Sequence, residues 1–379
     1  MRLLRFARND RKLNMQPKIG IVLINYKTYA KRFLEDCRDS MRKIDYPKDK
    51  YVVYIVDNAT SPETEAYIHE TWPEAVILPN KENSGWGGGN NVGIERAFAD
   101  GCEDIVLSNM DVIVHQDWLK ELVEAAYSDK KIGMVQSKLL LWPIKDGVQR
   151  INSVGNQIHF LGFGYCKGYG EPEIVRNPSQ PPQNPRGGEF EDIPYASGAS
   201  CYIKGEVFKK IGLCNPDFFM YHDDVELCLK AKLAGYRIVL APKSIMWHKY
   251  EFGRSILQVY YMERNRLITV LEFYKLPTLA LLAPAFFVME LCVFAGSLVG
   301  GYAKPKLRSW GYFFKVSSWK KICRERRSIQ ALRRMSDRAF LQDATGRILF
   351  QEVMNPVLKY IVNPAMSIYW RVAKQIMFW

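Results

Sequence analysis

The amino-acid sequence predicts an α/β fold: a Rossmann-like mixed sheet flanked by helices, followed by a C-terminal helical region that associates with a membrane. From Lys18 onward, short apolar runs alternate with helical patterns, which is typical of βαβ units. Hydrophobic residues make up 48% of the 379 residues, enough to form a sizeable core. A long apolar stretch at 276–302, followed at once by a basic segment, predicts the membrane-associated region.

Five apolar runs in the first part of the body, residues 18–140, are predicted to form buried strands. They are bounded by polar or turn-forming residues and span 19–24, 51–56, 76–78, 104–107 and 132–137. Helical patterns alternate with them at 30–42, 62–71, 91–100 and about 117–128. The second of these helices is expected to begin sharply, because Ser61 is a capping residue and Pro62 fits a first helical turn.

The second part of the body, residues 141–275, opens with a stretch rich in glycine, proline and aromatic residues. Its segment 155–170 resembles a hairpin and its segment 178–188 a mobile loop, so 142–195 is interpreted as a lid or an acceptor-side insertion. Regular structure is then predicted for strands at 199–204 and 237–240 and for helices at 205–211, 224–234 and 256–273.

The net charge of +13 is concentrated at the two ends of the chain. Residues 1–18, which include a basic leader at 1–17, carry a net +5, and residues 304–338 carry a net +10. The body between them is slightly acidic. This distribution argues against a chain that wraps nucleic acid along its length and favours a body tethered to an anionic surface.

Cysteine usage and the N-terminus indicate a cytosolic body. The eight cysteines form no C-x-x-C pattern and no cluster with histidine, so neither a zinc site nor a disulfide framework is predicted. The first 25 residues are basic but lack the apolar run and cleavage site of a secretory signal.

The apolar segment at 276–303 contains one charge, Glu290, and is long enough as a helix to cross a bilayer. Glu290 and the prolines at 277 and 284 argue against a simple span, because a carboxylate in the bilayer is costly unless it is paired. A spanning helix, a re-entrant hairpin, a helix half-sunk in the interface and a buried core helix all stay open. The basic tail at 304–379 favours a place at the cytoplasmic face of the cell membrane, peripheral or with one membrane segment.

Polar residues follow the predicted strands, where open α/β sheets bind their ligands. They also line the glycine-rich segment 83–93, whose helix start offers N–H groups to a phosphate or a sugar hydroxyl. This segment follows the third strand rather than the first, so it is a weak dinucleotide fingerprint. The candidate binding residues are Asn25, Tyr26, Asp57, Asn58, Asn83, Gly85, Asn90, Asn109 and Asp111.

Taken together, VLINYKTYA, IVDNAT, NKENSGWGGGNNVGIERA, LSNMDVIV, ASGASCYIK, FFMYHDDVELCLKAKLAGYRIVLAPKSIMWHK and YYMERNRL resemble the family 2 glycosyltransferases. The bacterial rhamnosyltransferase-like branch is the most similar, and the resemblance covers about residues 18–273. It implies a GT-A fold, a nucleotide-sugar donor, Mg²⁺ or Mn²⁺, and transfer with inversion at the anomeric carbon.

The resemblance also implies roles for the acidic residues. Asp111 matches the last aspartate of the family's D-x-D metal motif, and His248 matches a histidine that approaches the metal or the diphosphate. Asn109 takes the place of the motif's first acid, which puts strict metal dependence in question. Asp224 matches the catalytic base of a paired-acid motif that usually reads Glu-Asp, and Asp223 is its helper. Adjacent carboxylates at a helix start also raise one pKa, which suits a base.

The remaining matches concern the donor. Asp57 is expected to hydrogen-bond the base or ribose, and either Arg264 or Arg266 is expected to clamp the diphosphate from a helix face. Only one of these arginines can face the site, because residues two apart on a helix point about 200° apart.

The sequence therefore predicts an inverting glycosyltransferase that moves a sugar from dTDP-rhamnose or a UDP-sugar to a lipid-linked or cell-surface glycan acceptor. The first alternative is a catalytically inactive membrane-bound scaffold of the same fold, suggested by Asn109. Nucleic-acid binding through 304–338 is a weaker alternative, because that segment adjoins the apolar one.

Overall fold

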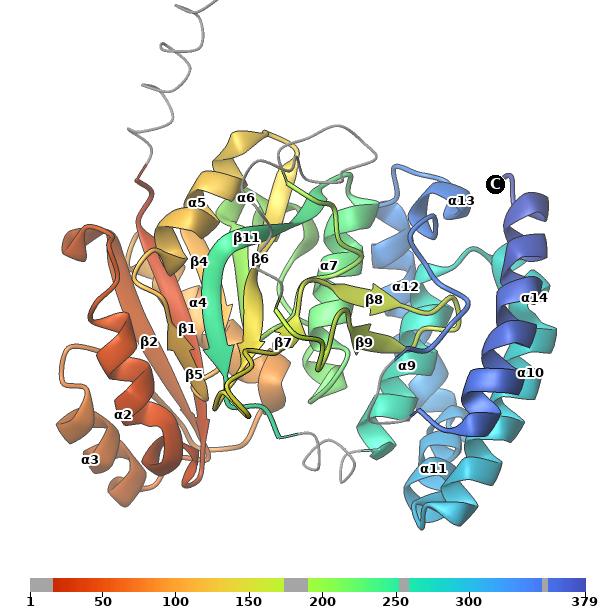
Figure 1. Cartoon of the computed structure of the whole chain (residues 1–379), viewed down its shortest axis with the longest axis horizontal. Helices are drawn as coiled ribbons and strands as arrows, with labels where there is room; N and C mark the ends of the chain where they lie inside the picture. The colour runs from red at the N-terminus through yellow and green to blue at the C-terminus, as the bar shows by residue number, and fades with distance from the viewer. Residues whose placement is uncertain (1–15, 174–189, 252–258, 350–353) are drawn as a thin grey trace, which may run out of the picture.

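The computed structural model describes residues 16–173, 190–251, 259–349 and 354–379 (Figure 1). Several predictions fall wholly or partly outside these residues: the basic leader at 1–17, the insertion at 142–195 with its mobile loop at 178–188, the first residues of the helix at 256–273, and residues 350–353 of the tail at 304–379.

Nine of the described strands form one sheet, and two more form a hairpin. The sheet runs β3-β2-β1-β4-β10-β6-β11-β5, and β7 pairs with β6 beside this path. The strands are β1 (Ile19–Tyr26), β2 (Tyr51–Asn58), β3 (Val76–Asn80), β4 (Asp104–Ser108), β5 (Val112–Val114), β6 (Ile132–Leu141), β7 (Ile151–Ser153), β8 (Asn156–Ile158), β9 (Gly164–Cys166), β10 (Ser200–Lys204) and β11 (Arg237–His248).

The sheet is mixed, as predicted. Strand β1 pairs in parallel with β2 and β4, whereas β10 runs antiparallel to both β4 and β6. Since β1, β2, β3 and β4 are parallel, their carboxyl ends lie at one edge, and this edge carries most of the predicted binding residues.

Twelve α-helices surround the sheet or follow it in the described part of the chain. They are α2 (Tyr29–Met41), α3 (Pro62–Thr71), α4 (Gly85–Ala99), α5 (Trp118–Ser128), α6 (Gly205–Ile211), α7 (Asp223–Leu233), α9 (Val259–Phe273), α10 (Leu276–Val299), α11 (Ala303–Gly311), α12 (Val316–Ala331), α13 (Asp337–Phe340) and α14 (Asn363–Ile376). Short 3₁₀ or π turns occur at Lys48–Lys50 (η1), Pro216–Phe218 (η2), Tyr312–Phe314 (η3) and Leu358–Val362 (η5).

Each face of the sheet has its own core, because alternate side chains of a strand point to opposite faces. Ile21 and Leu23 of β1 pack in the core that includes α2 and α5. Val22, between them, packs in the core that includes α4, α6 and α7. This second core continues without a break to Leu282 of α10 and Trp370 of α14, so the C-terminal helices belong to the same packed body.

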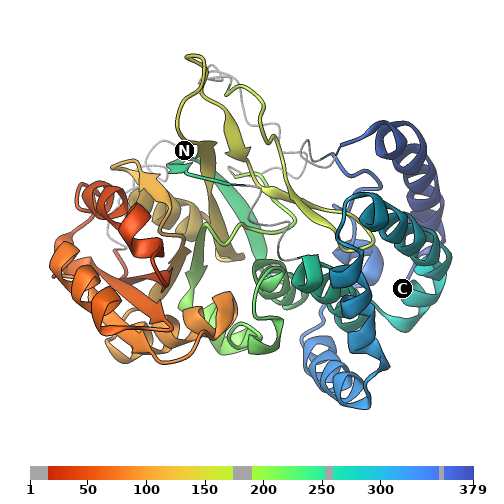
Figure 2. The ribbon, with the colours of Figure 1, turned by 90° about the horizontal axis from the view of Figure 1, so that it is seen from below.

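Helices α10 to α14 are grouped at one end of the molecule, opposite α2 and α3 (Figures 1 and 2). Helix α9 connects them to the sheet, packing against both α11 and α12. The apolar segment predicted at 276–303 is a single helix, α10, rather than a re-entrant hairpin. Its hydropathy is high, but only 17% of its most apolar window is buried, which excludes the fully buried core helix.

Three local predictions differ from the structure. Helix α4 begins at Gly85, six residues before the predicted start, because glycines depress helix propensity although tertiary packing tolerates them here. Strand β11 continues through an irregularity between Ala241 and Ile245, so His248 lies at its end rather than after a turn. Strand β5 was not predicted, since its three residues give too short a pattern.

Candidate active site

The carboxyl ends of β1 and β2 are joined by a buried polar network. Asn25 and Asp57 are register partners, and Asn25 Nδ2 donates to Asp57 Oδ1 at 2.6 Å. The other oxygen of Asp57 accepts from the hydroxyls of Thr60 and Thr64 at 2.6 and 2.8 Å. Asp57 is fully buried, so its carboxylate holds the two loops together, and a contact with a base or ribose would require these bonds to rearrange. Tyr26, at the same edge, is exposed.

Asn58 ties the end of β2 to the start of α4. Its Nδ2 donates to the carbonyl of Gly85 at 2.9 Å, while its Oδ1 accepts from Asn80 Nδ2 at 2.9 Å and from Ser84 Oγ at 3.1 Å. Asn83 Oδ1 accepts from the N–H of Gly85 at 3.0 Å. These amides therefore fix the position of the helix start rather than standing free at the surface.

The glycines at the start of α4 let the acidic loop approach closely. Gly85 has a φ of +75°, and a Cβ there would lie 1.9 Å from the carbonyl oxygen of Phe219. A Cβ on Gly87 would lie 2.7 Å from Asp223 Oδ1. Asn90, one turn further along, is buried and donates to the carbonyl of Trp86 at 2.9 Å. Donor-binding and acidic candidates thus meet at one helix N-terminus.

His248 lies beside the end of β4 with both ring nitrogens in polar contacts. Its Nε2 is 3.2 Å from Asp111 Oδ1 and 3.4 Å from Asn109 Nδ2. Its Nδ1 is 3.0 Å from Asn152 Oδ1. An amide oxygen only accepts, so this contact assigns a proton to Nδ1, and Nε2 is the ring nitrogen that faces Asp111.

This arrangement fits a divalent cation. Two ligands at about 2.1 Å from one ion and at right angles to it are about 3 Å apart, close to the separation of His248 Nε2 and Asp111 Oδ1. Asn152 would hold the ring in the ligating tautomer, as outer partners of metal-bound histidines do. Within the described residues, no third His, Cys, Asp or Glu completes a metal cluster, so a substrate would have to supply further ligands.

Asp224 is the accessible member of the acidic pair at the start of α7. It is half-buried, and it accepts from the N–H of Gly198 at 3.1 Å and from its neighbour Val225 at 2.9 Å. A Cβ on Gly198 would lie 2.5 Å from Trp86 Cζ2, so the indole ring packs directly on the turn that holds Asp224.

Asp223 is nearly inaccessible, with 2% of its surface exposed. Burial, followed by the nearby charges of Asp224 and Glu226, raises the pKa of Asp223 well above its usual value. Burial also raises the pKa of Asp224, but the N–H groups of Gly198 and Val225 oppose that rise. The environments of the two acids thus favour Asp224 as the one that is ionised and reachable.

The segment that contains Asp111 and the segment that contains Asp224 are connected through one short turn, residues 197–199. The N–H of Asn109 donates to the carbonyl of Ala199 at 3.2 Å. The N–H of Gly198, the residue before Ala199, donates to Asp224. Strand β10, which follows this turn, pairs with β4. Asp111 and Asp224 therefore flank the same edge of the sheet rather than opposite sides of the molecule.

Arg264 and Arg266 do point in different directions, but both are buried. Arg264 Nη2 donates to the carbonyls of Asp217 and Phe218 at 2.7 and 2.8 Å. Arg266 forms ion pairs with two glutamates, one of them Glu290 of α10. The expected clamp on a diphosphate is replaced by contacts within the protein, because the helix that carries both arginines is enclosed by α11 and α12.

Sequence reasoning missed several residues that shape this site. Three of them, Asn152, Gly198 and Asn265, form their contacts across long sequence separations, so no local pattern reveals them. The fourth, His222, is the left-handed N-cap residue of α7.

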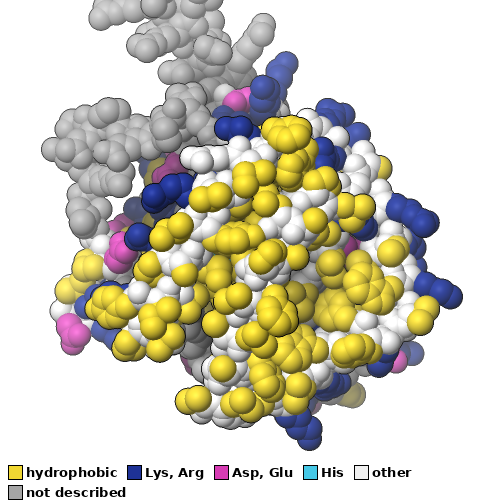
Figure 3. Space-filling view, turned by 90° about the vertical axis from the view of Figure 1, so that its right-hand side faces the viewer, with side chains coloured by type: hydrophobic (Ala, Val, Ile, Leu, Met, Phe, Trp, Pro, Cys, Tyr) yellow, Lys and Arg dark blue, Asp and Glu magenta, His cyan; other side chains and the backbone are white. Residues whose placement is uncertain are grey.

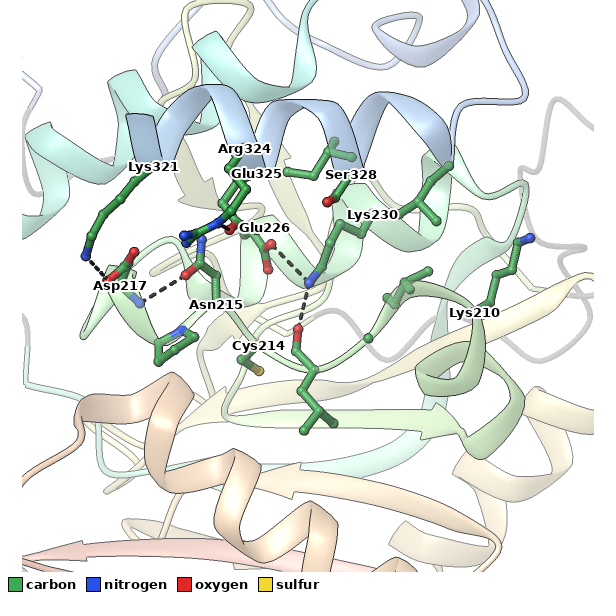
Figure 4. A pocket seen from close by; sticks show the side chains of 16 residues that line it. Lys210, Cys214, Asn215, Asp217, Glu226, Lys230, Lys321, Arg324, Glu325 and Ser328 are labelled. Carbon is green, nitrogen blue, oxygen red and sulfur yellow. Dashed lines mark hydrogen bonds and ion pairs between the residues drawn. The ribbon is translucent and has the colours of Figure 1, made fainter. Parts of the chain in front are cut away.

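A cavity of about 710 Å³ lies between α7 and α12, away from the predicted residues (Figure 4). Most of its charged side chains are paired: Lys230 contacts Glu226 at 3.0 Å, Lys321 contacts Asp217 at 2.6 Å, and Arg324 contacts Glu325 at 2.9 Å. The carbonyl of Leu213 accepts a further bond from Lys230 at 2.7 Å. Because Lys210 also belongs to the lining, the cavity has one more basic than acidic side chain.

The family described as "Glycosyltransferase like family 2" matches residues 17–269 of this chain. Among curated proteins, the low-salt glycan biosynthesis hexosyltransferase Agl10 of Haloferax volcanii is 22% identical over 260 residues. That alignment covers 67% of this chain and 76% of the relative.

Among solved structures, GalNAc-T7 with UDP, GalNAc and Mn²⁺ superposes with a TM-score of 0.52 at 15% identity. The match covers 69% of this chain and 48% of that one, so this chain spans about half the length of that protein. The mannosyltransferase PcManGT of Pyrobaculum calidifontis, with GDP-Man and Mn²⁺, has a TM-score of 0.48 at 16% identity and covers 99% and 93% of the two chains. The expected GT-A type fold is confirmed.

Proposed function

The chain belongs to the glycosyltransferase like family 2, and from this premise we propose that it is an inverting hexosyltransferase. It moves a sugar from a nucleoside-diphosphate sugar to a lipid-linked or cell-surface glycan acceptor. The observation that carries the proposal is the turn at residues 197–199, which bonds to Asn109 on one side and to Asp224 on the other. This connection supports a cation-binding pair and a base at one edge of the sheet.

The Asp111–His248 pair and Asp224 would meet the two chemical requirements of sugar transfer. A departing nucleoside diphosphate needs its negative charge stabilised, and the acceptor hydroxyl needs to lose a proton on the opposite face of the sugar. Asp224 takes that proton, since it is half-buried and anchored by the N–H of Gly198. Asp223 lies buried beside it, and burial raises the pKa of Asp223, which favours a lower combined charge on the pair.

Asp111 and His248 would hold Mg²⁺ or Mn²⁺, and the cation would stabilise the charge of the diphosphate when bound. The Mn²⁺ in the GalNAc-T7 structure supports this assignment without deciding between the two metals. Asn109 contributes an amide in place of an acid, so we expect the metal to bind more weakly than in a site with two carboxylates.

The start of α4 would receive the donor. The helix start is bonded to Asn58, the register partner of the exposed Tyr26, and a helix N-terminus favours a phosphate. The N–H groups of Gly85 and Trp86 are already bonded to Asn83 Oδ1 and to the carbonyl of Phe219, so a phosphate would be bound by the rest of the first turn or would displace these bonds. The buried side chains of Asn25, Asp57 and Asn58 lie beneath this surface and fix the loops that form it. A UDP-sugar or dTDP-rhamnose fits such a site, and UDP in the GalNAc-T7 structure favours uridine.

The domain boundaries that we propose assign one part of the chain to the acceptor and another part to the membrane. Residues 18–140 form the donor half and 141–275 the acceptor half, while 276–303 and the basic tail 304–379 face the cytoplasmic side of the cell membrane. Single additions are expected, because α10 (Leu276–Val299) is the one helix in the described part of the chain that is long and apolar enough to cross a membrane. The hexosyltransferase Agl10, named for glycan biosynthesis, supports this class of acceptor.

The second candidate function is an inactive membrane-bound scaffold, which Asn109 in the place of an acid favours. Turnover of a panel of nucleotide sugars by the full chain, with and without Mn²⁺, separates the two. We expect hydrolysis or transfer with one donor class, and a loss of about a thousandfold in Asp224→Asn with donor binding retained. No turnover with any donor would favour the scaffold, and equal turnover in the wild type and Asp224→Asn would refute the assignment of Asp224 as the base.

A further inference from the structure

Helix α10 presents an apolar face to solvent along its whole length. Large side chains on this face include Phe287 and Val299, which are 67% and 93% exposed. The exposed positions recur every three or four residues, and none of them is charged. A helix of 24 residues is about 36 Å long, so this face far exceeds the isolated apolar residues that ordinary surfaces carry.

Helix α14 extends this surface beside α10. Tyr369 donates to the carbonyl of Leu281 on α10, which fixes the two helices side by side. Ile368, Val372 and Ile376 of α14 are exposed at intervals of four residues, on one face of the helix. We call the exposed apolar residues of α10 and α14 the apolar face (Figure 3).

Positive charge surrounds the apolar face. Figure 3 shows hydrophobic side chains gathered in the middle of this side of the molecule and Lys and Arg around its edges. From residue 276 onward, no Asp or Glu in the described residues is exposed, whereas exposed Lys and Arg are numerous. These basic residues include Lys304, Arg308, Lys315, Lys320, Arg327, Arg334, Arg338, Lys359 and Arg371.

A buried charge cluster holds the middle of α10 against the body. Glu290 accepts from Lys306 Nζ at 2.8 Å and from Trp310 Nε1 at 2.6 Å, and it also pairs with Arg266. Arg266 contacts Glu263 of α9 at 2.9 Å. Moving α10 alone into a bilayer would separate Glu290 from these partners and strand charges on both sides.

We propose that the apolar face lies on a lipid bilayer that contains anionic lipids, with α10 and α14 parallel to its plane and no helix crossing it. The apolar residues sink into the interface and the surrounding Lys and Arg bind lipid headgroups. A second copy of this chain fits less well, because it would bring the same positive charge to the contact. The proposal does not depend on catalysis.

Vesicle binding of the full chain tests this directly. We expect it to sediment with vesicles of phosphatidylcholine and phosphatidylglycerol and to bind much less to phosphatidylcholine alone. Phe287→Asp with Ile368→Asp should weaken binding at least tenfold, which corresponds to about 1.4 kcal/mol. A matched control, Ile144→Asp with Val148→Asp, alters exposed apolar residues outside the face and should bind as the wild type does.

Orientation is tested with an added cysteine at Lys275→Cys or Lys304→Cys, in a chain where the exposed Cys292 and Cys323 and the partly exposed Cys166 are serine and the other cysteines are buried. Both should react with an impermeant maleimide on intact vesicles, because both ends of α10 stay outside. Protection of one end until detergent is added would mean that α10 spans the bilayer. Unchanged binding in the double variant, or a dimer that this variant dissociates without any vesicle binding by the wild type, would overturn the proposal.

The loop before Asp223 carries a second, independent feature. Phe219, Tyr221 and His222 all have φ values of +65°, a left-handed conformation that is costly for residues other than glycine. Such a conformation persists only where the surroundings hold it. The loop lies against α4 on one side, where the N–H of Trp86 donates to the carbonyl of Phe219 at 2.7 Å.

Asn265 of α9 holds the other side of this loop. Its Nδ2 lies 2.9 Å from the carbonyls of Phe218 and Met220 and 2.8 Å from that of Tyr221. Arg264 braces Asn265 by donating from Nε to its Oδ1 at 2.9 Å. Every carbonyl that Asn265 reaches lies within five residues of Asp223.

We infer that Asn265 is a positioning residue, which sets the strained loop so that Asp224 meets the acceptor hydroxyl. This inference rests on the proposed function. Asn265→Ala should lower kcat at least tenfold (roughly the change that a small misplacement of a base causes) while KM for the donor changes little. Asn265→Gln, which keeps the N–H donors, should recover part of kcat.

Gln330→Ala provides the matched control, because Gln330 also donates from one amide to two carbonyls of α9, those of Glu272 and Phe273, at 2.8 and 3.0 Å. It should cost similar stability without lowering kcat. Equal losses of kcat in both variants, or an unchanged kcat in Asn265→Ala, would overturn the inference while wild-type turnover stands. Absence of wild-type turnover would instead refute the proposed function.

Discussion

His248 Nε2 lies 3.2 Å from Asp111 Oδ1, although the two residues are 137 positions apart in the chain. Strand β11 delivers the histidine and the end of β4 delivers the aspartate. Their contact depends on Asn152, whose amide oxygen lies 3.0 Å from the other ring nitrogen. The proposed cation site therefore has two ordered side chains, one of them held by Asn152.

Removing the imidazole should remove the metal. We expect His248→Ala to abolish the rise in melting temperature that Mn²⁺ gives to the wild type. Asn152→Ala leaves both ligands in place but frees the ring, so Mn²⁺ affinity should fall by about tenfold. Calorimetric titration measures both, and equal affinity in all three proteins would contradict the metal assignment.

Restoring the missing acid should strengthen the same site. Asn109 Nδ2 lies 3.4 Å from His248 Nε2, close enough for a carboxylate at position 109 to join the ion. Asn109→Asp is therefore expected to bind Mn²⁺ roughly tenfold more tightly and, without metal, to be less stable because two carboxylates then face each other. If Asn109→Asp binds Mn²⁺ more tightly but is as stable as the wild type without metal, the new carboxylate attracts the ion from a distance and does not face Asp111.

The sequence predicted which residues lie at the carboxyl edge of the sheet, but not which of them face a ligand. Strand ends follow from periodicity, so Asn25, Asp57 and Asp111 were expected at one edge, and they lie there. Whether such a residue faces a ligand or a neighbouring loop depends on contacts across the fold. Asp57 shows this, since the hydroxyls of Thr60 and Thr64 occupy its carboxylate.

The arginines of α9 illustrate the same limit. Helical geometry correctly predicted that Arg264 and Arg266 point apart, but it gave no sign of what encloses them. Helices from after residue 300 cover α9, and Lys306 joins Arg266 in the cluster around Glu290. Residues that pack against a helix from about forty or more positions away in the chain leave no pattern in the sequence of the helix itself. For the same reason, the role of Asn265 could not be predicted.

Close packing at Gly198 provides a test of the base. A Cβ there would lie 2.5 Å from Trp86 Cζ2, so Gly198→Ala must displace either the indole ring or the turn that holds Asp224. We expect kcat to fall by about tenfold or more with the fold intact. Gly311→Ala is the control, because nothing lies within 4 Å of its Cβ position. Equal kcat in the two variants would show that the turn does not position Asp224.

Glu272 should make the protein less stable as the pH rises. Burial, followed by the charges of Glu226 and Glu325, raises the pKa of Glu272 to about 9. The native state therefore holds a proton that the unfolded chain releases above its ordinary pKa of about 4.5. Native stability is fully present below that pH and is lost progressively as the pH rises toward 9.

Glu272→Gln removes this titration, because an amide mimics the protonated acid at every pH. At pH 8 the variant should be more stable than the wild type by on the order of 2 to 4 kcal/mol, with a melting temperature several degrees higher. Near pH 4 the two proteins should unfold together. Denaturant titrations at both pH values measure the difference, with the exposed Glu95→Gln as a variant that should follow the wild type throughout. A stability gain in Glu272→Gln that is the same at pH 4 and pH 8 would show that packing, rather than the buried charge, is responsible.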